Sequence, residues 1–181
     1  MKAVSNSYPQ KLRQTFPDLE EAVAYFSVGC LSERRKQMGL RTLKQCAEVS
    51  YPKLVDLAQA YGTSECPSLL LEAYITNLND SCNANRMSEA QIREAGEIMF
   101  GEALYLKLTE VHEFFRRVKA AYYGEYFGSL DVLKIMADLR LFLKDRAEAV
   151  RRIEAEEAWR KRNEEWDRRQ KEWEHAHPDN V

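Results

Sequence analysis

The sequence predicts an all-α fold, with a compact multi-helix domain and a long charged C-terminal helix. Three observations predict it. Helix start and stop signals recur along the chain, the alternating pattern of β-strands is almost absent, and acid-before-base pairs four residues apart dominate the last segment. The length of 181 residues and the apolar fraction of 45% support one hydrophobic core of ordinary domain size.

The N-terminal third carries the signals of four short, closely spaced helices. Three of them begin one or two residues after an aspartate, threonine or proline. Glycines follow three of them, where a left-handed residue can end a helix. The predicted stretches are 19–29, 31–38, 43–49 and 54–61.

Two longer helices are expected in the middle of the chain. Pro67 stands near the start of the first, and the polar stretch 77–85 that follows it is a candidate loop between two halves. Ser88 fits a capping box with the glutamine three residues later. Gly96 and Gly101 either weaken the second helix or let a neighbour pack close to it.

The next two helices are joined by a glycine-containing turn. Thr109 is predicted to cap the first of them, and Gly124 is expected to end it in a left-handed conformation. Gly128 then belongs to the turn, and Asp131 marks a restart. Apolar residues recur at three- and four-residue steps over 132–153, so this helix should line the core.

These signals predict a division of the chain into four parts. The core stripe ends near residue 153, and beyond it the sequence is dominated by charge. The expected parts are a disordered N-terminus at 1–7, a helical domain at 8–153 with a candidate sub-boundary at 79–87, a charged helical extension at 154–176 and a disordered C-terminus at 177–181.

Three tryptophans are the large apolar residues of the extension. Their spacing of seven places them on one slowly drifting line, and the first lies about 120° around the helix from Ile153, so they do not extend the core stripe. We interpret them as a docking seam for a protein partner or a second copy. The alternative is an exposed charged helix whose tryptophans fold back on their own domain or fray. Arg162 and Gln170 fill the second apolar position of a true coiled coil, which weakens the docking interpretation. This tryptophan line consists of Trp159, Trp166 and Trp173.

An aromatic cluster surrounds the predicted glycine turn. One interpretation is a platform on which a partner's side chains or nucleic-acid bases stack, with nearby arginines to meet phosphates. The other, which we favour, is a connection whose aromatics cover the end of the core. The cluster comprises Tyr122, Tyr123, Tyr126 and Phe127.

A local basic segment is the candidate nucleic-acid contact. The formal charge is +4 over residues 1–53, −6 over 54–110 and zero over 111–181, so no domain-wide basic field would attract nucleic acid. A solvated surface is therefore the favoured interpretation, and phosphate contact the alternative. The basic segment comprises Arg34, Arg35, Lys36, Arg41 and Lys44.

The sequence carries no pattern typical of catalysis. The four cysteines form no Cys-x-x-Cys pair and stand far from the three histidines, so neither a metal site nor a nucleophile has local support. His112 is expected to be an ordinary surface or core histidine. We expect no enzyme activity, no cofactor, no small-molecule substrate and no membrane insertion, and the absence of a signal segment predicts a cytoplasmic protein with reduced thiols.

One stretch resembles a known group of proteins. The matching pattern runs from Tyr105 through Tyr123-Gly124, Tyr126 and Leu130-Asp131 to Leu139. It is similar to an uncharacterised family of small helical proteins from Bacteroidota genomes, phages and mobile elements, over about residues 85–146. The resemblance brings no catalytic residues. It implies a setting of mobile DNA, where helicase loaders are one role for a helical protein.

Two functions follow as expectations. The first is a non-catalytic interaction or adaptor protein that docks a partner, or itself, through the tryptophan line. The second is a DNA-replication accessory protein that contacts nucleic acid through the basic segment.

Overall fold

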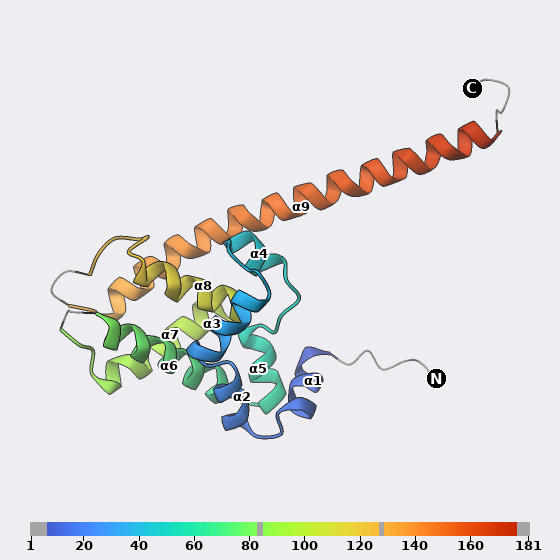
Figure 1. Ribbon diagram of the computed structural model, residues 1–181. Coiled ribbons are helices and arrows are strands. Elements are labelled where there is room, and N and C mark those ends of the chain that lie inside the picture. The colour runs from blue at the N-terminus through green and yellow to red at the C-terminus, as the bar shows by residue number, and fades with distance from the viewer. Residues whose placement is uncertain (1–6, 83–84, 127–128, 177–181) are drawn as a thin grey trace.

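The computed structural model describes residues 7–82, 85–126 and 129–176, and within these ranges every regular element is a helix (Figure 1). The described part contains two isolated β-bridges, Lys53 with Lys107 and Asn85 with Ser129, and no strand. The all-α prediction is confirmed. Residues 1–6 and 177–181 of the predicted disordered ends, together with Phe127 and Gly128, lie outside the described residues.

Nine helices make up the described part of the chain. Eight of them are 6 to 17 residues long, and the last has 45. They are α1 (Tyr8–Thr15), α2 (Leu19–Tyr25), α3 (Val28–Gln37), α4 (Leu43–Glu48), α5 (Leu54–Tyr61), α6 (Glu65–Ser81), α7 (Glu89–Ala103), α8 (Leu108–Lys119) and α9 (Val132–Ala176).

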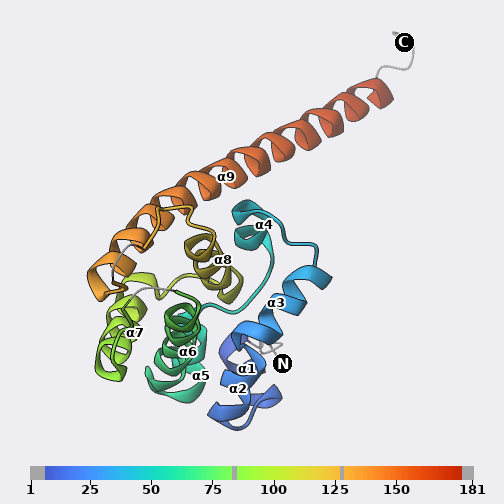
Figure 2. The ribbon, with the colours of Figure 1, turned by 60° about the vertical axis from the view of Figure 1, so that its left-hand side comes forward.

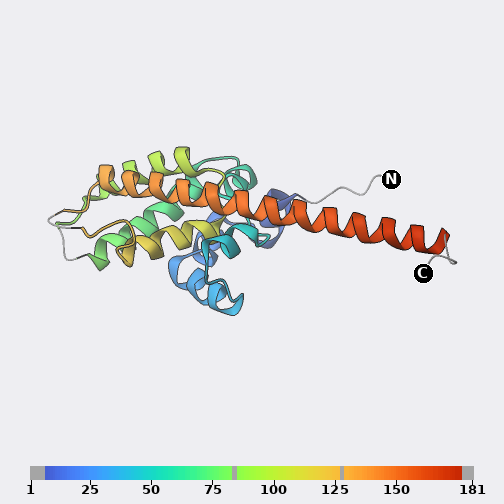
Figure 3. The same cartoon turned by 90° about the horizontal axis from the view of Figure 1, so that it is seen from above.

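Four helices form the centre of the domain. α6 packs on α7, α7 on α9, α9 on α8, and α8 on α6, so that they close a ring around the core (Figure 3). The short helices α1 to α5 lie against α6, α8 and the middle of α9 (Figure 2). Buried apolar residues from Leu12 to Phe142 form one continuous cluster. The helices share this core because a single short helix does not bury enough apolar surface to be stable alone.

α6 and α7 approach closely at Gly96. A Cβ atom at Gly96 would lie 3.1 Å from Glu72 Cγ and 3.5 Å from the Ser68 carbonyl oxygen, whereas a Cβ at Gly101 would meet nothing within 4 Å. Of the two explanations for these glycines, close packing therefore applies to Gly96 and not to Gly101.

The loop between α6 and α7 is held by its own side chains. The buried amide of Asn79 accepts a hydrogen bond from the Met87 N–H at 2.9 Å and donates one to the Met87 carbonyl at 3.3 Å. The candidate sub-boundary at 79–87 thus lies between two helices that share one core.

Several helix boundaries follow from the predicted local chemistry. The Thr42 hydroxyl accepts the Gln45 N–H at 3.2 Å at the start of α4, and Ser88 and Gln91 form the predicted capping box of α7. Gly62 ends α5 with φ of +69°, a conformation that other residues rarely adopt.

Several boundaries differ from the prediction. The stretch expected over 19–29 is divided, because α2 ends at Tyr25 and α3 begins at Val28, which places Gly29 inside α3. Thr109 does not cap α8, because its hydroxyl donates to the Cys46 carbonyl at 2.9 Å, and Glu110 instead accepts the N–H of the preceding Lys107. α8 also ends at Lys119 rather than at Gly124, although Gly124 does take a positive φ of +108° within the turn.

The sequence pattern also missed α1. This helix begins after Ser7, whose N–H donates to Gln10 Oε1 at 3.3 Å, and only Leu12 of its residues is buried. α1 buries one residue, so it lacks a long apolar stripe, but its start was encoded locally, because Ser7 and Gln10 form a capping box and Pro9 stands in the first turn.

α9 has two different environments along one unbroken helix. Asp131 accepts the Lys134 N–H at 2.8 Å at its start, as the predicted restart requires. Ile135, Met136, Leu139 and Phe142 are buried against the other helices, whereas every residue from 154 to 176 is exposed. The C-terminal part of α9 extends beyond the other helices (Figure 1). No described helix has an apolar stretch long enough to cross a bilayer.

Candidate functional site

α8 packs against four other helices, α3, α4, α6 and α9. All residues from Leu108 to Phe115 are buried, including Glu110, His112 and Glu113. An ionised side chain is costly to bury unless opposite charges and hydrogen bonds surround it. The partners of these three residues therefore define the polar interior of the molecule.

Glu113 is surrounded by three arginines. Its side chain is 1% exposed, and its carboxylate oxygens lie 2.6 Å from Arg35 Nη2, 2.8 Å from Arg116 Nε and 3.0 Å from Arg117 Nε. Burial works to raise the pKa of Glu113, but the hydrogen bonds from Arg116 and Arg117 and the charge of Arg35 lower it overall. One carboxylate thus faces three cations, and positive charge is left over.

Two further ion pairs attach α8 to the first part of α9. Arg117 Nη1 lies 2.9 Å from the Asp145 carboxylate, and Arg146 Nε donates to the buried Glu110 at 2.8 Å. Because both pairs join the two helices, they fix how α9 lies on the domain.

His112 lies beside this network in a neutral state. The buried Tyr74 hydroxyl lies 3.2 Å from His112 Nδ1. Burial, followed by the charge of Arg35, lowers the pKa of His112 to about 4. Burial also raises the pKa of Tyr74, so its hydroxyl keeps its proton. A phenol hydroxyl can donate to Nδ1 or accept from Nδ1–H, so Nε2 is the donor in one neutral tautomer of His112 and the acceptor in the other.

A pocket of about 520 Å³ opens between α3, the turn after it and α8. Cations from both helices line it, together with polar donors. Its main lining residues are Ser32, Arg35, Lys36, Arg41, His112 and Arg116.

The structure divides the predicted basic segment. Arg35 is only 8% exposed because it is paired with Glu113, while Lys36 and Arg41 are exposed and line the same pocket. Arg34 lies over the Tyr25 ring, 3.1 Å from its centroid, and Lys44 pairs with Glu156 of α9 at 2.5 Å. Three of the five residues come together, and the other two lie elsewhere.

The aromatic turn packs mostly inward. The Tyr126 hydroxyl donates to the buried Asp138 at 2.7 Å, and the Tyr123 hydroxyl lies 3.3 Å from Asp145. Tyr122 differs, since it is 64% exposed with Arg117 4.7 Å from its ring centroid. Tyr123 and Tyr126 thus hold the turn on α9, and Tyr122 faces solvent.

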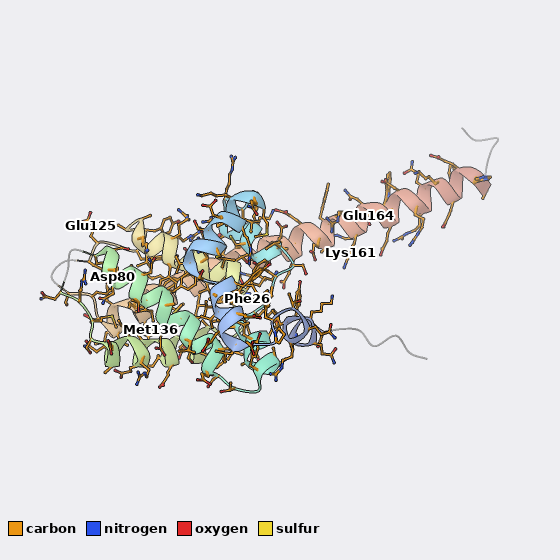
Figure 4. All side chains as sticks on the ribbon, turned by 60° about the horizontal axis from the view of Figure 1, so that its bottom comes forward. Phe26, Asp80, Glu125, Met136, Lys161 and Glu164 are labelled. Carbon is orange, nitrogen blue, oxygen red and sulfur yellow. The ribbon has the colours of Figure 1, made fainter. Side chains whose placement is uncertain are left out.

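All three tryptophans of the extension are exposed. Trp159, Trp166 and Trp173 are 61%, 63% and 51% exposed, on a part of α9 that reaches past the other helices. Figure 4 shows Lys161 and Glu164 on this part of the helix. The alternative in which the tryptophans pack back on their own domain does not describe this structure.

The predicted charge pairs of the extension form only in part. Arg169 lies 3.6 Å from Glu165, and Arg160 lies 3.9 Å from Glu164 rather than from Glu156. Glu156 instead binds Lys44. Among the ion pairs of the described residues, this is the last one along α9 that reaches the domain. Exposed pairs of this kind each contribute about 0.2 to 0.5 kcal/mol to a helix.

The cysteines show no activated thiol. Burial raises the pKa of Cys46 to about 11 and that of Cys66 to about 12, so both are neutral at physiological pH. Within the described ranges, no group of three histidine, cysteine, aspartate or glutamate side chains is placed to hold a metal ion.

The α3–α8 pocket is the feature that the sequence did not predict. Arg35 and His112 are far apart in the chain, and only the fold brings them together. One local signal existed, because Glu113 precedes Arg116 and Arg117 by three and four residues. That signal is common on exposed helices, so it did not indicate a buried cluster.

Comparison with known proteins identifies one family. Residues 86–165 match a family of unknown function, DUF6633. The match includes α7, α8 and α9 as far as the first tryptophan of the line, and it reaches beyond the resemblance expected over residues 85–146. Similarity of this region to an uncharacterised family is confirmed. No curated protein and no solved structure matches the chain.

Proposed function

We propose that this chain is a non-catalytic interaction protein that docks a helix along the tryptophan line of α9. The observation that carries the proposal is the exposure of all three tryptophans, between 51% and 63%, on a segment whose every residue is exposed. Large aromatic side chains are costly to leave in water and are frequent anchors of protein interfaces. Three of them on one face are a surface suited to a partner.

The geometry of α9 keeps this face accessible. At about 100° per residue, the tryptophans lie about 120° to 160° around the helix from Ile153, which faces the domain. A second helix can therefore lie along the tryptophan line without meeting the domain. The interface would begin just after Glu156, where α4 stops contacting α9 through Lys44.

The charge pattern favours a second copy of this chain in parallel orientation. With the tryptophans at heptad position d, Arg162 and Arg169 occupy position g, and Asp167 and Glu174 occupy position e. In a parallel pair, Arg162 faces the partner subunit's Asp167, and Arg169 faces the partner subunit's Glu174. An antiparallel pair would instead bring Arg162 against the partner subunit's Arg169, which is repulsive.

The polar residues at position a are compatible with this arrangement. With the tryptophans at d, position a holds Asn163, rather than the Arg162 predicted from the sequence, together with Gln170. A buried asparagine at such a position fixes register at a cost in stability. We therefore expect a weak, concentration-dependent dimer rather than an obligate one.

The direct test measures molecular mass in solution as a function of protein concentration. Replacing all three tryptophans with alanine should abolish association and leave the thermal melt of the domain nearly unchanged. The matched control is Lys161→Ala, Glu164→Ala and Arg168→Ala, on the opposite face of the same helix, which should still associate. A collapsed melt in the tryptophan variant would show that these residues stabilise their own domain, and the proposal would be wrong.

Charge reversal tests the orientation. Arg162→Glu with Arg169→Glu should disrupt a parallel pair, and adding Asp167→Arg with Glu174→Arg should restore it. In an antiparallel pair the fourfold variant stays repulsive. If the wild-type chain is monomeric throughout, the self-association proposal fails, and a nuclease-treated pull-down then asks whether a different protein occupies the tryptophan line.

A nucleic-acid role through the basic segment remains the competing hypothesis, within the setting of Bacteroidota phages and mobile elements that the resemblance implies. What supports it is the meeting of Arg35, Lys36 and Arg41 at one pocket. Binding to short single-stranded or duplex DNA that weakens steeply with salt would favour this function. Absent or salt-independent binding would remove it.

A further inference from the structure

We infer that the α3–α8 pocket binds the phosphate group of a small phosphorylated ligand, such as a nucleotide. The pocket has a volume of about 520 Å³, which lies within the range of roughly 300 to 1,000 Å³ typical of small-molecule sites. This inference does not depend on the tryptophan line, since the pocket belongs to the domain and not to the extension.

The lining of the pocket is cationic and contains no carboxylate. Arg35, Lys36, Arg41 and Arg116 contribute four positive charges. Two carboxylates bind these lining cations from outside the pocket. Glu113 pairs with Arg35, Arg116 and Arg117, and the exposed Glu33 pairs with Lys36 at 2.7 Å. The excess of positive charge favours an anion in the pocket.

The cations are held in place before any ligand arrives. Ion pairs with Glu113 restrain the side chains of Arg35 and Arg116, so these two arginines lose less conformational freedom when a ligand binds. Arg35 Nε is buried and has no hydrogen-bond partner in the described part of the protein, so what Arg35 brings to the pocket is its positive charge and not this N–H.

His112 adds an uncharged imidazole. Its Nδ1 is engaged by Tyr74, so Nε2 is the ring nitrogen left for a ligand, and it donates in the tautomer that carries the proton there. Guanidinium forks, a lysine and an imidazole N–H are together the donors that recognise phosphate oxygens. A carboxylate ligand would use fewer of them.

A compact ligand fits better than a nucleic-acid strand. A strand needs a cationic track that continues beyond one phosphate. Here the neighbouring cations of the basic segment are engaged elsewhere, Arg34 over the Tyr25 ring and Lys44 with Glu156. Neither of these two cations therefore extends the lining of the pocket.

The test is titration calorimetry of the full chain with inorganic phosphate, pyrophosphate and ATP, with adenosine as the uncharged comparison. We expect the phosphorylated probes to bind and adenosine not to bind. Arg41→Gln combined with Arg116→Gln should weaken ATP binding by about tenfold or more, since each removes a charge-assisted contact. Arg34→Gln combined with Lys44→Gln removes the same charge outside the pocket and should leave the affinity within about twofold.

Folding controls and contrary outcomes are defined in advance. Arg41 is exposed, so Arg41→Gln alone tests the pocket without disturbing the core. The inference is overturned if no phosphorylated probe binds at about 1 mM, the weak end of specific affinity, or if both double variants weaken binding equally. It is also overturned if DNA binds more tightly than ATP and depends on Arg34 and Lys44, because the site would then be a nucleic-acid surface.

Discussion

The first and second parts of α9 are one continuous helix with two different reasons to be helical. Over residues 132–153, Ile135, Leu139 and Phe142 are buried, and packing against the domain stabilises the helix. Over residues 154–176 every side chain is exposed, and the helix is supported by local charge pairs such as Glu165 with Arg169, and near its start by the pair of Glu156 with Lys44. The same backbone therefore serves as core in one part and as presented surface in the other.

Charged residues differ between the two regions in the same way. Glu113 in the domain is buried among three arginines, whereas Glu165 on the extension lies 3.6 Å from Arg169 in solvent. The ion pairs of Glu113 contribute to the stability of the fold, because removing one partner leaves a buried charge without its counter-charge. The pair of Glu165 with Arg169 is nearly independent of the fold, because water can replace either partner.

Truncating one large apolar residue in each part should give the largest contrast. Phe142→Ala should lower the free energy of unfolding by about 3 to 5 kcal/mol, because it opens a cavity at a fully buried position. Trp166→Ala should change it by less than about 0.5 kcal/mol, since the side chain is 63% exposed. Urea unfolding at low protein concentration measures both, and equal losses would show that the extension packs on the domain.

Neutralising one glutamate in each region gives the next contrast. Glu113→Gln should cost about 3 kcal/mol, because three arginines lose their shared counter-charge and one of them, Arg35, is buried. Glu164→Gln on the extension should cost less than about 0.5 kcal/mol. Chemical denaturation of the two variants side by side decides the point. A small effect at Glu113 would mean that water enters the cluster.

The pH dependence of stability supplies a smaller contrast. The pKa of His112 falls to about 4 in the fold from an ordinary value near 6.5, so the unfolded chain binds the proton more readily between these values. Its contribution is complete above about pH 6.5 and is lost as pH falls toward 4, about 2 kcal/mol between pH 7.5 and pH 5. Burial of the neutral imidazole is the cause.

His112→Gln should therefore flatten the stability profile over this pH window, and denaturant midpoints at several pH values will show it. His175→Gln is the matched control, because that residue lies on the exposed end of α9. An unchanged profile in the His112 variant would assign the acid sensitivity to other groups.

Local chemistry made most of the fold predictable. Thr42, Ser88, Gly62 and Asp131 mark helix boundaries because the groups that satisfy an end of a helix lie within a few residues of it. The prediction failed where the deciding contact is distant. Thr109 looked like a cap, yet its hydroxyl binds the Cys46 carbonyl across the core.

The candidate sites were predictable to different degrees. The tryptophan line could be read from spacing, because residues seven apart share a face of any helix, whatever surrounds it. The pocket could not, because its lining comes from α3 and α8, which are far apart in the chain. The basic segment was read as one unit, but Arg35 turns into the core while Arg34 stacks on Tyr25.

The sequence by itself determined the all-helical class, the order of helices α2 to α9, and the change from an apolar to a charged surface near residue 153. Helix periodicity and caps are encoded by neighbours in the chain, so no tertiary contact is needed to read them. Only the tertiary structure decided that α8 is buried from Leu108 to Phe115 and that Glu113 gathers three arginines. Whether the charged residues of a helix such as α8 are exposed or buried depends on the helices that pack against it, and the sequence of α8 alone does not specify them.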